Sequence, residues 1–394
     1  MFKHPIYHIV KQRIEEPRKF IQILMGPRQV GKSTVIKQVL EDISIPYKFF
    51  AADFVPASNS QWIANCWEAA RMQQAIDGSS VLLVIDEIQK IDNWSEIVKK
   101  LWDEDSFHGR DIKVVLLGSS RILLKRGLTE SLAGRFEEIR MSQWGYSEMR
   151  ECFGYDLNQY LFFGGYPGSA TLMPDQTRFE SYIESSIVDA SINKDILFDT
   201  RISKPALMRQ TFEMAAAYSG RLLSLTKLLG QLQDAGNTTT LAHYMHLLKE
   251  AGLVGSLEKY AVDMARSRSS VPKFQVFDNS LKDIYLPYTF EEIRLDPAAW
   301  GTVFESGIGA YIICQSFLHR FEVFYWRERN MEVDFILRKK GVIVALEIKS
   351  NDEKTSKGLE VFCKKFKPHR ALIVGDGGMH PEDFLSLPLS NLFK

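Results

Sequence analysis

The feature that most constrains this chain is the run GPRQVGKST, which extends from Gly26 to Thr34. It follows FIQILM at 20–25, an apolar stretch that indicates a buried strand, and it opens a predicted helix from Lys32 to about Asp42. The run matches G-x-x-x-x-G-K-[ST], and a strand before it with a helix after it is the context this pattern needs to form a phosphate-binding loop. A strand–loop–helix unit that binds a nucleotide is therefore the first prediction.

The loop has a role for each of its residue types. Glycines let backbone N–H groups close around phosphates, and the helix N-terminus adds the positive end of its dipole. Lys32 is expected to reach the β- and γ-phosphates, and Ser33 to place its hydroxyl on Mg²⁺. ATP and Mg²⁺ are thus the predicted cofactors. The predicted nucleotide-binding residues of the loop are Gly26, Pro27, Arg28, Gln29, Val30, Gly31, Lys32, Ser33 and Thr34.

The rest of the N-terminal part alternates strands with helices. Further strands are expected at 47–54, 81–86, 114–120 and 136–141, and helices at 5–17, 62–76 and 95–105. Because the strands are continuous apolar runs, they are expected to be buried on both faces. This pattern predicts an α/β fold with a parallel sheet.

Polar residues follow two of these strands. Asp86 ends the apolar run VLLVI and is expected on the magnesium side of the phosphates, with Glu87 next to it to orient or deprotonate the attacking water. Ser119 and Ser120 end the next strand, where a hydroxyl can contact the γ-phosphate, and the sequence does not rank the two. The acidic pair favours hydrolysis over binding alone, although a structural pair at a strand end is the alternative.

Arg135 precedes the predicted strand at 136–141. An arginine at this place can reach the γ-phosphate bound by a neighbouring subunit and stabilise charge in the transition state. The plainer interpretation is a surface arginine at a helix end.

The chain resembles the AAA+ ATPases in the order of four motifs, GPRQVGKST, LLVIDEIQKI, LLGSS and LAGRFEEI. Among these ATPases it resembles a large prokaryotic family of ATP-binding proteins that have an AAA domain and a C-terminal domain of unknown function. The resemblance implies Lys32, Ser33, Asp86 and Glu87 as the core site and Arg135 as the finger of an oligomer, with a hexamer favoured. FGGYP at 163–167 matches the family's GG-aromatic-Pro turn, which implies Gly165 and Pro167 beside the adenine. No arginine of the expected helical lid is an obvious second sensor.

The middle of the chain has the order helix, helix, turn, helix and strand. Helices are expected at 205–220, 225–233 and 238–250, before a strand at 253–260, which is the order of a winged helix. The third helix is expected to expose Thr240, His243, Tyr244 and Lys249, which in a DNA-binding winged helix face the major groove. One lysine is a weak electrostatic signal, so a protein–protein module stays an equal alternative.

The C-terminal part combines acidic residues with strands expected at 321–326, 332–337, 342–348 and 370–376 and helices around 300–318 and 356–366. Glu305 lies on the first helix, Asp334 on a strand, and Glu347 and Lys349 on one face of the next strand. Three carboxylates and a lysine can hold Mg²⁺ for phosphodiester hydrolysis. The set resembles the PD-(D/E)xK nucleases, which implies a restriction-endonuclease-like α/β fold. Such folds also serve as assembly platforms without cleavage.

The composition of the chain argues against several classes of protein. Lysine plus arginine equals aspartate plus glutamate, 49 each, which gives no global sign of nucleic-acid or membrane binding. Four scattered cysteines without CxxC spacing exclude a zinc or disulfide framework. The N-terminus is too charged for a signal peptide and no apolar run reaches the ~20 residues of a membrane span, so a cytoplasmic protein is expected.

The expected organisation is a multidomain α/β protein. It comprises an ATPase core at 1–145, a helical lid at 146–200, a winged-helix-like region at 201–265 and a nuclease-like domain at 266–394. Three functions remain open: an oligomeric ATPase that engages or remodels DNA, a nucleotide-controlled switch that assembles with a protein partner, and an ATP-dependent nuclease. The sequence identifies no particular protein partner.

Overall fold

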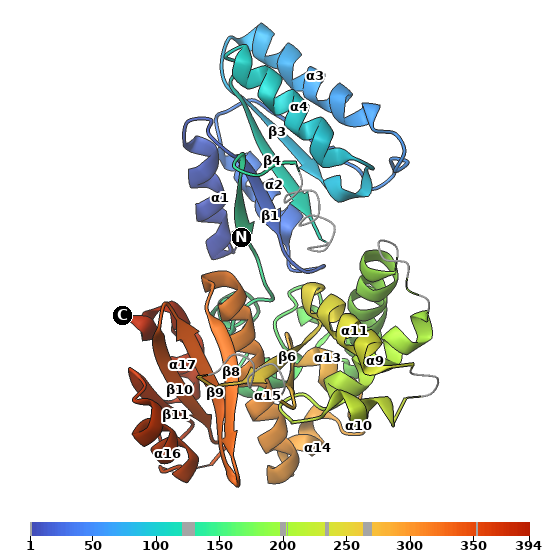
Figure 1. The fold of residues 1–394 in the computed structure, drawn as a ribbon. Helices are drawn as coiled ribbons and strands as arrows, with labels where there is room; N and C mark the ends of the chain where they lie inside the picture. The colour runs from blue at the N-terminus through green and yellow to red at the C-terminus, as the bar shows by residue number, and fades with distance from the viewer. Residues whose placement is uncertain are drawn as a thin grey trace. The chain divides into compact units, whose positions relative to one another are not determined.

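The computed structural model describes residues 2–119, 131–197, 202, 204–232, 236–262, 270–351 and 354–394 (Figure 1). The chain divides into two compact units, Met1–Met141 and Ser142–Lys394. No helix among the described residues has the length and apolar character that crossing a membrane requires.

The first unit contains a five-stranded sheet in which every pair of neighbours is parallel. The strand order is β2-β3-β4-β1-β5. The strands are β1 (Ile21–Met25), β2 (Tyr47–Ala51), β3 (Val81–Asp86), β4 (Ile112–Gly118) and β5 (Phe136–Arg140). The parallel sheet confirms the prediction from the apolar runs. Because β4 lies between β1 and β3, the residues that follow these three strands meet at one edge of the sheet.

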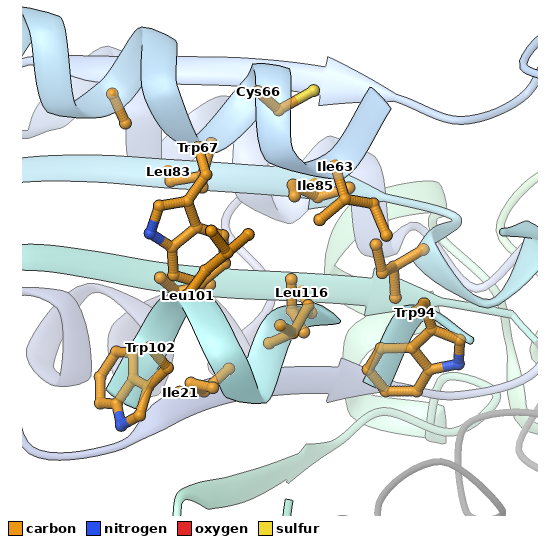
Figure 2. Packing of buried hydrophobic residues seen from close by; sticks show 14 of the residues in the cluster. Ile21, Ile63, Cys66, Trp67, Leu83, Ile85, Trp94, Leu101, Trp102 and Leu116 are labelled. Carbon is orange, nitrogen blue, oxygen red and sulfur yellow. The ribbon is translucent and has the colours of Figure 1, made fainter. Parts of the chain in front are cut away.

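Helices cover this sheet: α1 (Pro5–Glu15), α2 (Lys32–Asp42), α3 (Gln61–Asp77) and α4 (Trp94–Phe107), with a 3₁₀ turn η1 (Ile88–Lys90) after β3. Figure 2 shows how α3 and α4 pack on the strands, with Ile63 and Trp67 of α3 and Leu101 of α4 lying over Leu83 and Leu116 of the sheet. These side chains are at most 8% exposed. Burial of this apolar surface is the main force that holds the layers together.

A buried carboxylate joins the two helices. Asp105 of α4 is fully buried and accepts hydrogen bonds from the Trp67 indole at 2.6 Å and from the Arg71 guanidinium at 2.8 Å. Both donors lie on α3, so this one side chain ties α3 to α4. A buried charge is tolerated only with such partners.

The helices of the second unit precede, interrupt and follow the strands of its sheet. They are α6 (Tyr146–Phe153), α7 (Leu157–Phe163), α8 (Gln176–Tyr182), α9 (Pro205–Ala217), α10 (Leu225–Leu229), α11 (Thr238–Glu250), α13 (Ser280–Asp283), α14 (Phe290–Arg294), α15 (Pro297–His319), α16 (Lys357–Phe366) and α17 (Pro381–Ser386). Two π-helical segments, η3 (Ile183–Asp189) and η4 (Ser191–Ile196), continue α8, and 3₁₀ turns form η2 (Ala170–Leu172) and η5 (Leu389–Phe393). The mainly helical stretch after about 150 agrees with the sequence pattern.

A six-stranded mixed sheet follows, in the order β11-β10-β9-β8-β6-β7. The strands are β6 (Val254–Lys259), β7 (Lys273–Val276), β8 (Glu322–Glu328), β9 (Met331–Lys339), β10 (Val342–Ile348) and β11 (Arg370–Val374). The pairs β6–β8 and β10–β11 are parallel, and the others are antiparallel. Since β7 lies after the boundary expected at 265 but pairs with β6 before it, one sheet continues across that boundary.

The exposed face of α11 differs from the expectation. Tyr244, expected to face outward, is only 3% exposed. It lies on the same helical face as the buried Leu241 and Leu248, at i,i+3 and i,i+4 spacing, and so belongs to the core side. His243 and Lys249 are exposed as expected, and Thr240 is half-buried with its hydroxyl bonded to Asn237.

Candidate functional site

The loop after β1 has the backbone of a phosphate cradle. Gly31 adopts φ 93° immediately before α2, a conformation that favours glycine. A side chain at Gly26 would place its Cβ 2.2 Å from the carbonyl oxygen of Met141, so only glycine fits there. The Lys32 ammonium is buried and donates to the carbonyl oxygens of Gly26 at 3.0 Å and Pro27 at 2.7 Å. The loop therefore closes around its own lysine.

The other predicted loop residues complete this turn. Arg28, Gln29 and Val30 connect Pro27 to Gly31, and Gln29 has φ 60°, which is uncommon for a residue with a side chain. Thr34 lies in the first turn of α2. These four residues belong to the same continuous run as Lys32 and Ser33.

The loop serine meets the acidic residue of β3. Ser33 Oγ donates to Asp86 Oδ2 at 2.8 Å, so residues 53 positions apart are in direct contact. Burial raises the pKa of the Asp86 carboxyl, and the bond from Ser33 opposes this shift. A hydroxyl and a carboxylate are the oxygen ligands that Mg²⁺ prefers, and Mg²⁺ takes most of its remaining ligands from phosphates and water. The pair fits a magnesium ion held beside a nucleotide.

Glu87 is held in one orientation by two side chains. Its Oε2 accepts from Gln89 Nε2 at 2.6 Å and from Ser119 Oγ at 3.1 Å. Its backbone has φ 53°, and strain of this kind in a residue with a side chain clusters at functional sites. Ser119 comes from the end of β4, so the strand between β1 and β3 delivers the hydroxyl to the acid. Ser120, its unranked alternative, lies outside the described residues.

Gln89 was not identified from the sequence. It is 8% exposed and belongs to the 3₁₀ turn that follows Glu87. The only sequence signal is an amide two residues after the acidic pair, which is too common to be specific. The contact depends on the tight turn of the backbone after β3.

Arg135 lies away from its own phosphate-binding loop. Its backbone carbonyl accepts from Ile21 N at the start of β1, whereas the loop follows the end of β1. A five-residue strand spans roughly 15 Å. The guanidinium donates to both carboxylate oxygens of Asp103 on α4, at 2.7 and 3.0 Å. Arg135 therefore lies at the edge of the sheet opposite its own loop.

The turn with Gly165 and Pro167 belongs to the second unit. Gly165 N donates to Asp278 Oδ2 at 2.6 Å, and a Cβ at Gly164 would lie 1.8 Å from the same carboxylate. Burial raises the pKa of the Asp278 carboxyl to about 6. The turn is thus fixed on a buried acid that sequence reasoning did not identify.

Two of the C-terminal acids, Glu305 and Asp334, are joined by a lysine that the sequence did not indicate, and Glu347 pairs with Lys349. Lys273 of β7 is fully buried, and its Nζ lies 2.7 Å from Glu305 Oε1 and 3.5 Å from Asp334 Oδ1. Lys349 Nζ lies 3.3 Å from Glu347 Oε1. Across the described part of the chain, no group of three or more His, Cys, Asp or Glu side chains is arranged to hold a metal ion.

Electrostatics agree with a crowded cluster. Burial raises the pKa of Glu305, Asp334 adds to the shift, and Lys273 opposes it. Burial and the charge of Asp334 raise the pKa of Glu347 to about 7, against the effect of Lys349. The charge of Asp334 acts on both acids, and its Oδ2 accepts a hydrogen bond from Ile348 N, next to Glu347, at 2.8 Å. For Lys273, burial would lower the pKa, but Glu305 and Asp334 together raise it above its usual value.

Comparison with known proteins adds a family for the first unit. Residues 18–150 match the model of an AAA domain. The match supports an AAA-type ATP-binding family. Within this AAA-type domain, the match includes the loop, Asp86, Glu87 and Ser119, and it suggests an ATPase that binds a nucleotide. Residues 154–288 and 300–389 match two domains of unknown function, DUF8612 and DUF4143.

Two relatives resemble the chain over most of its length. An uncharacterized protein of Haemophilus influenzae is 23% identical over 364 residues, covering 87% of this chain and 86% of its own. An uncharacterized protein of Methanocaldococcus jannaschii is 22% identical over 383 residues, covering 88% of this chain and 79% of its own. A solved structure described as the structural basis for katanin self-assembly is 16% identical, with a TM-score of 0.28. It is aligned over 39% of this chain and 55% of its own.

Proposed function

We propose that this protein binds ATP with Mg²⁺ at the loop after β1 and hydrolyses it. The observation that carries the proposal is the 2.8 Å bond between Ser33 and Asp86, which joins the loop to the acidic strand end where a phosphate-bound cation is needed. The buried Lys32 and the anchored Glu87 are on the same edge of the sheet. These are the parts that phosphoryl transfer to water requires.

Each residue has a distinct role in this proposal. Lys32 and the loop N–H groups bind the phosphates, and Ser33 and Asp86 hold the cation. Mg²⁺, when bound, neutralises charge that develops on the phosphate oxygens. Glu87 orients the attacking water and accepts its proton, while Gln89 and Ser119 keep its carboxylate in place.

The test separates binding from turnover. Lys32→Ala should abolish ATP binding, whereas Glu87→Gln should bind ATP and barely hydrolyse it, measured by a fluorescent ATP analogue and by phosphate release. Glu41→Gln, an exposed acid on α2, is the matched control and should behave as wild type. Hydrolysis by Glu87→Gln at the wild-type rate would refute the catalytic assignment.

We also propose that Arg135 acts on the nucleotide of a neighbouring subunit in an oligomer, with a hexamer favoured by the resemblance. Its position opposite its own loop supports action in trans. The ion pair with Asp103 is partly exposed, 33% and 43%, so its release costs at most about 1 kcal/mol.

Mixing subunits tests this. Arg135→Ala and Glu87→Gln subunits are each expected to be inactive alone, and their mixture should recover part of the activity because some interfaces pair an intact finger with an intact acid. A strictly monomeric protein with full activity would eliminate the shared site.

A second candidate function is DNA engagement by the second unit. The three helices α9, α10 and α11 followed by the antiparallel strands β6 and β7 support a winged-helix-like module beside the C-terminal sheet. Stimulation of ATP hydrolysis by single-stranded, duplex or branched DNA is expected. If none of these stimulates hydrolysis, a nucleotide-controlled switch with a protein partner is the better function.

Cleavage of DNA is the third possibility, and the cluster around Lys273 argues against it. The lysine supplies the positive charge that a metal would bring, so a platform role fits the acids better. Metal-dependent cleavage that is lost in Lys349→Ala would restore the nuclease interpretation.

A further inference from the structure

The second unit contains an open groove of about 610 Å³ between α10, the end of β6 and the β8–β9 hairpin. Four of the residues that line it are basic and none is acidic. Lys227 lies on α10, Lys259 ends β6, Arg327 lies on β8, and Arg329 lies in the turn that joins β8 to β9. The basic side chains thus converge from three parts of the fold that are distant in sequence.

Two acids, Glu328 and Glu332, lie beside this groove, fewer than its four basic side chains. Glu328 pairs with Lys365 of α16, and the bond from Lys365, with the charges of Lys259 and Arg329, lowers the pKa of its carboxyl. A carboxylate oxygen of Glu332 is 3.9 Å from Arg327 Nε, a loose pair in which the Arg327 side chain is 49% exposed. A concave surface with one sign of charge focuses the electrostatic potential and attracts an anion.

The face of α11 has no comparable charge. Its exposed side chains include two histidines, Ala242 and Thr239, and Lys249 is its one lysine. Sequence-independent affinity for DNA comes from lysine and arginine placed on phosphates. By that criterion the groove is the stronger candidate surface in the second unit.

We propose that this groove binds the phosphodiester backbone of DNA. The inference rests on the DNA engagement proposed above and identifies the surface that makes the contact. Lys227, Arg327 and Arg329 are exposed, as contacts to an extended polyanion require, and Ser224 beside them adds a hydroxyl. Because these groups would contact phosphates and not base edges, binding is expected to be independent of the DNA sequence and to fall steeply with salt concentration.

The experiment measures binding of a short fluorescein-labelled DNA strand, and of its duplex, to the full chain by anisotropy over a range of salt concentrations. The test variant is Lys227→Gln with Arg327→Gln. The matched control is Lys357→Gln with Lys364→Gln, which removes the same charge from exposed positions on α16. Lys249→Gln tests α11 separately. Circular dichroism and thermal unfolding of each variant establish that it is folded.

Loss of two phosphate contacts should weaken single-strand binding about 25-fold at 0.1 M salt and reduce the salt slope by about 1.4. The single variant Lys227→Gln, on an exposed helical position, should weaken it about 5-fold and serves if the double variant does not fold. The control and Lys249→Gln should each bind within about twofold of wild type.

Two results would overturn the inference, and they differ in whether the proposed DNA engagement is also refuted. If wild type binds DNA and the groove variants bind equally well, or if Lys249→Gln loses as much as they do, the groove is wrong and DNA engagement stands. If wild type binds no DNA at low salt, both fail, and the ATPase proposal is still decided by Glu87→Gln alone.

Discussion

Replacement of Lys273 by methionine should destabilise the second unit at neutral and alkaline pH. The ammonium is fully buried and lies 2.7 Å from Glu305 and 3.5 Å from Asp334. Methionine has a similar length, but it removes the ammonium that lies over the Phe335 ring and leaves two carboxylates without their counter-charge. Removing one partner of a buried ion pair costs about 3–5 kcal/mol. Because the side chains of Glu305 and Asp334 are 31% and 15% exposed, we expect the lower value, about 3 kcal/mol.

The loss should depend on pH in a defined direction. The pKa of Glu305 is already raised by burial, and Lys273 opposes that shift, so the variant raises the pKa further. A carboxyl whose folded pKa lies above its unfolded value contributes stability at low pH that is lost as pH rises through the folded pKa. The difference between wild type and Lys273→Met should therefore be larger at pH 8 than at pH 5.

Urea unfolding, followed by tryptophan fluorescence at both pH values, measures this difference. Lys349→Met is the control: it removes a lysine that is 27% exposed and should cost less than about 1 kcal/mol. A loss below about 1 kcal/mol for Lys273→Met, or the same loss at both pH values, would refute the argument that this lysine neutralises the cluster.

Three further results are expected. Asp105→Ala should lower the unfolding free energy of the first unit by about 3 kcal/mol in urea titrations. The neighbouring variant Glu104→Ala, which removes a side chain that is 40% exposed, should stay within about 0.5 kcal/mol. Glu347→Gln should raise the unfolding free energy at pH 8 by as much as about 3 kcal/mol and leave it unchanged at pH 4. The reason is that the wild-type carboxyl has a pKa of about 7 and destabilises the fold only at a pH where it must ionise. Equal effects at both pH values would contradict this. Gln89→Leu should lower kcat for ATP about tenfold with KM unchanged, because it removes one hydrogen bond to Glu87. Steady-state kinetics in which only KM changes would contradict this.

Much of the first unit followed from local pattern. The helix predicted from Lys32 to about Asp42 and the strand at 81–86 have those bounds in the structure, because a glycine-rich turn and a continuous apolar run are signals contained in neighbouring residues. Ser119 could be placed only as one of two serines. Its contact with Glu87 depends on β4 lying between β1 and β3, which is a property of the sheet order and not of the segment.

The second unit shows where local signals end. Lys273 occurs in KFQV, a short strand that gives no sign of its partners, and it meets Glu305 and Asp334 through contacts 32 and 61 residues away in sequence. Tyr244 was expected on the exposed face of the third helix of a winged helix, but its side chain is buried on the core side of α11. Both cases were decided by tertiary packing.

The pairing of β6 with β8 has a consequence for how such chains can evolve. Two separately recognised segments, 154–288 and 300–389, share one sheet, since β6 pairs through Glu258 with Phe324 and through Lys259 with Tyr325. Recombination that exchanged either segment for an unrelated one would open a bare strand edge, which invites aggregation. Gene fusion and shuffling should therefore transmit the two segments as a single heritable module, whereas the AAA-type domain, which is a compact unit by itself, is free to be joined to other partners.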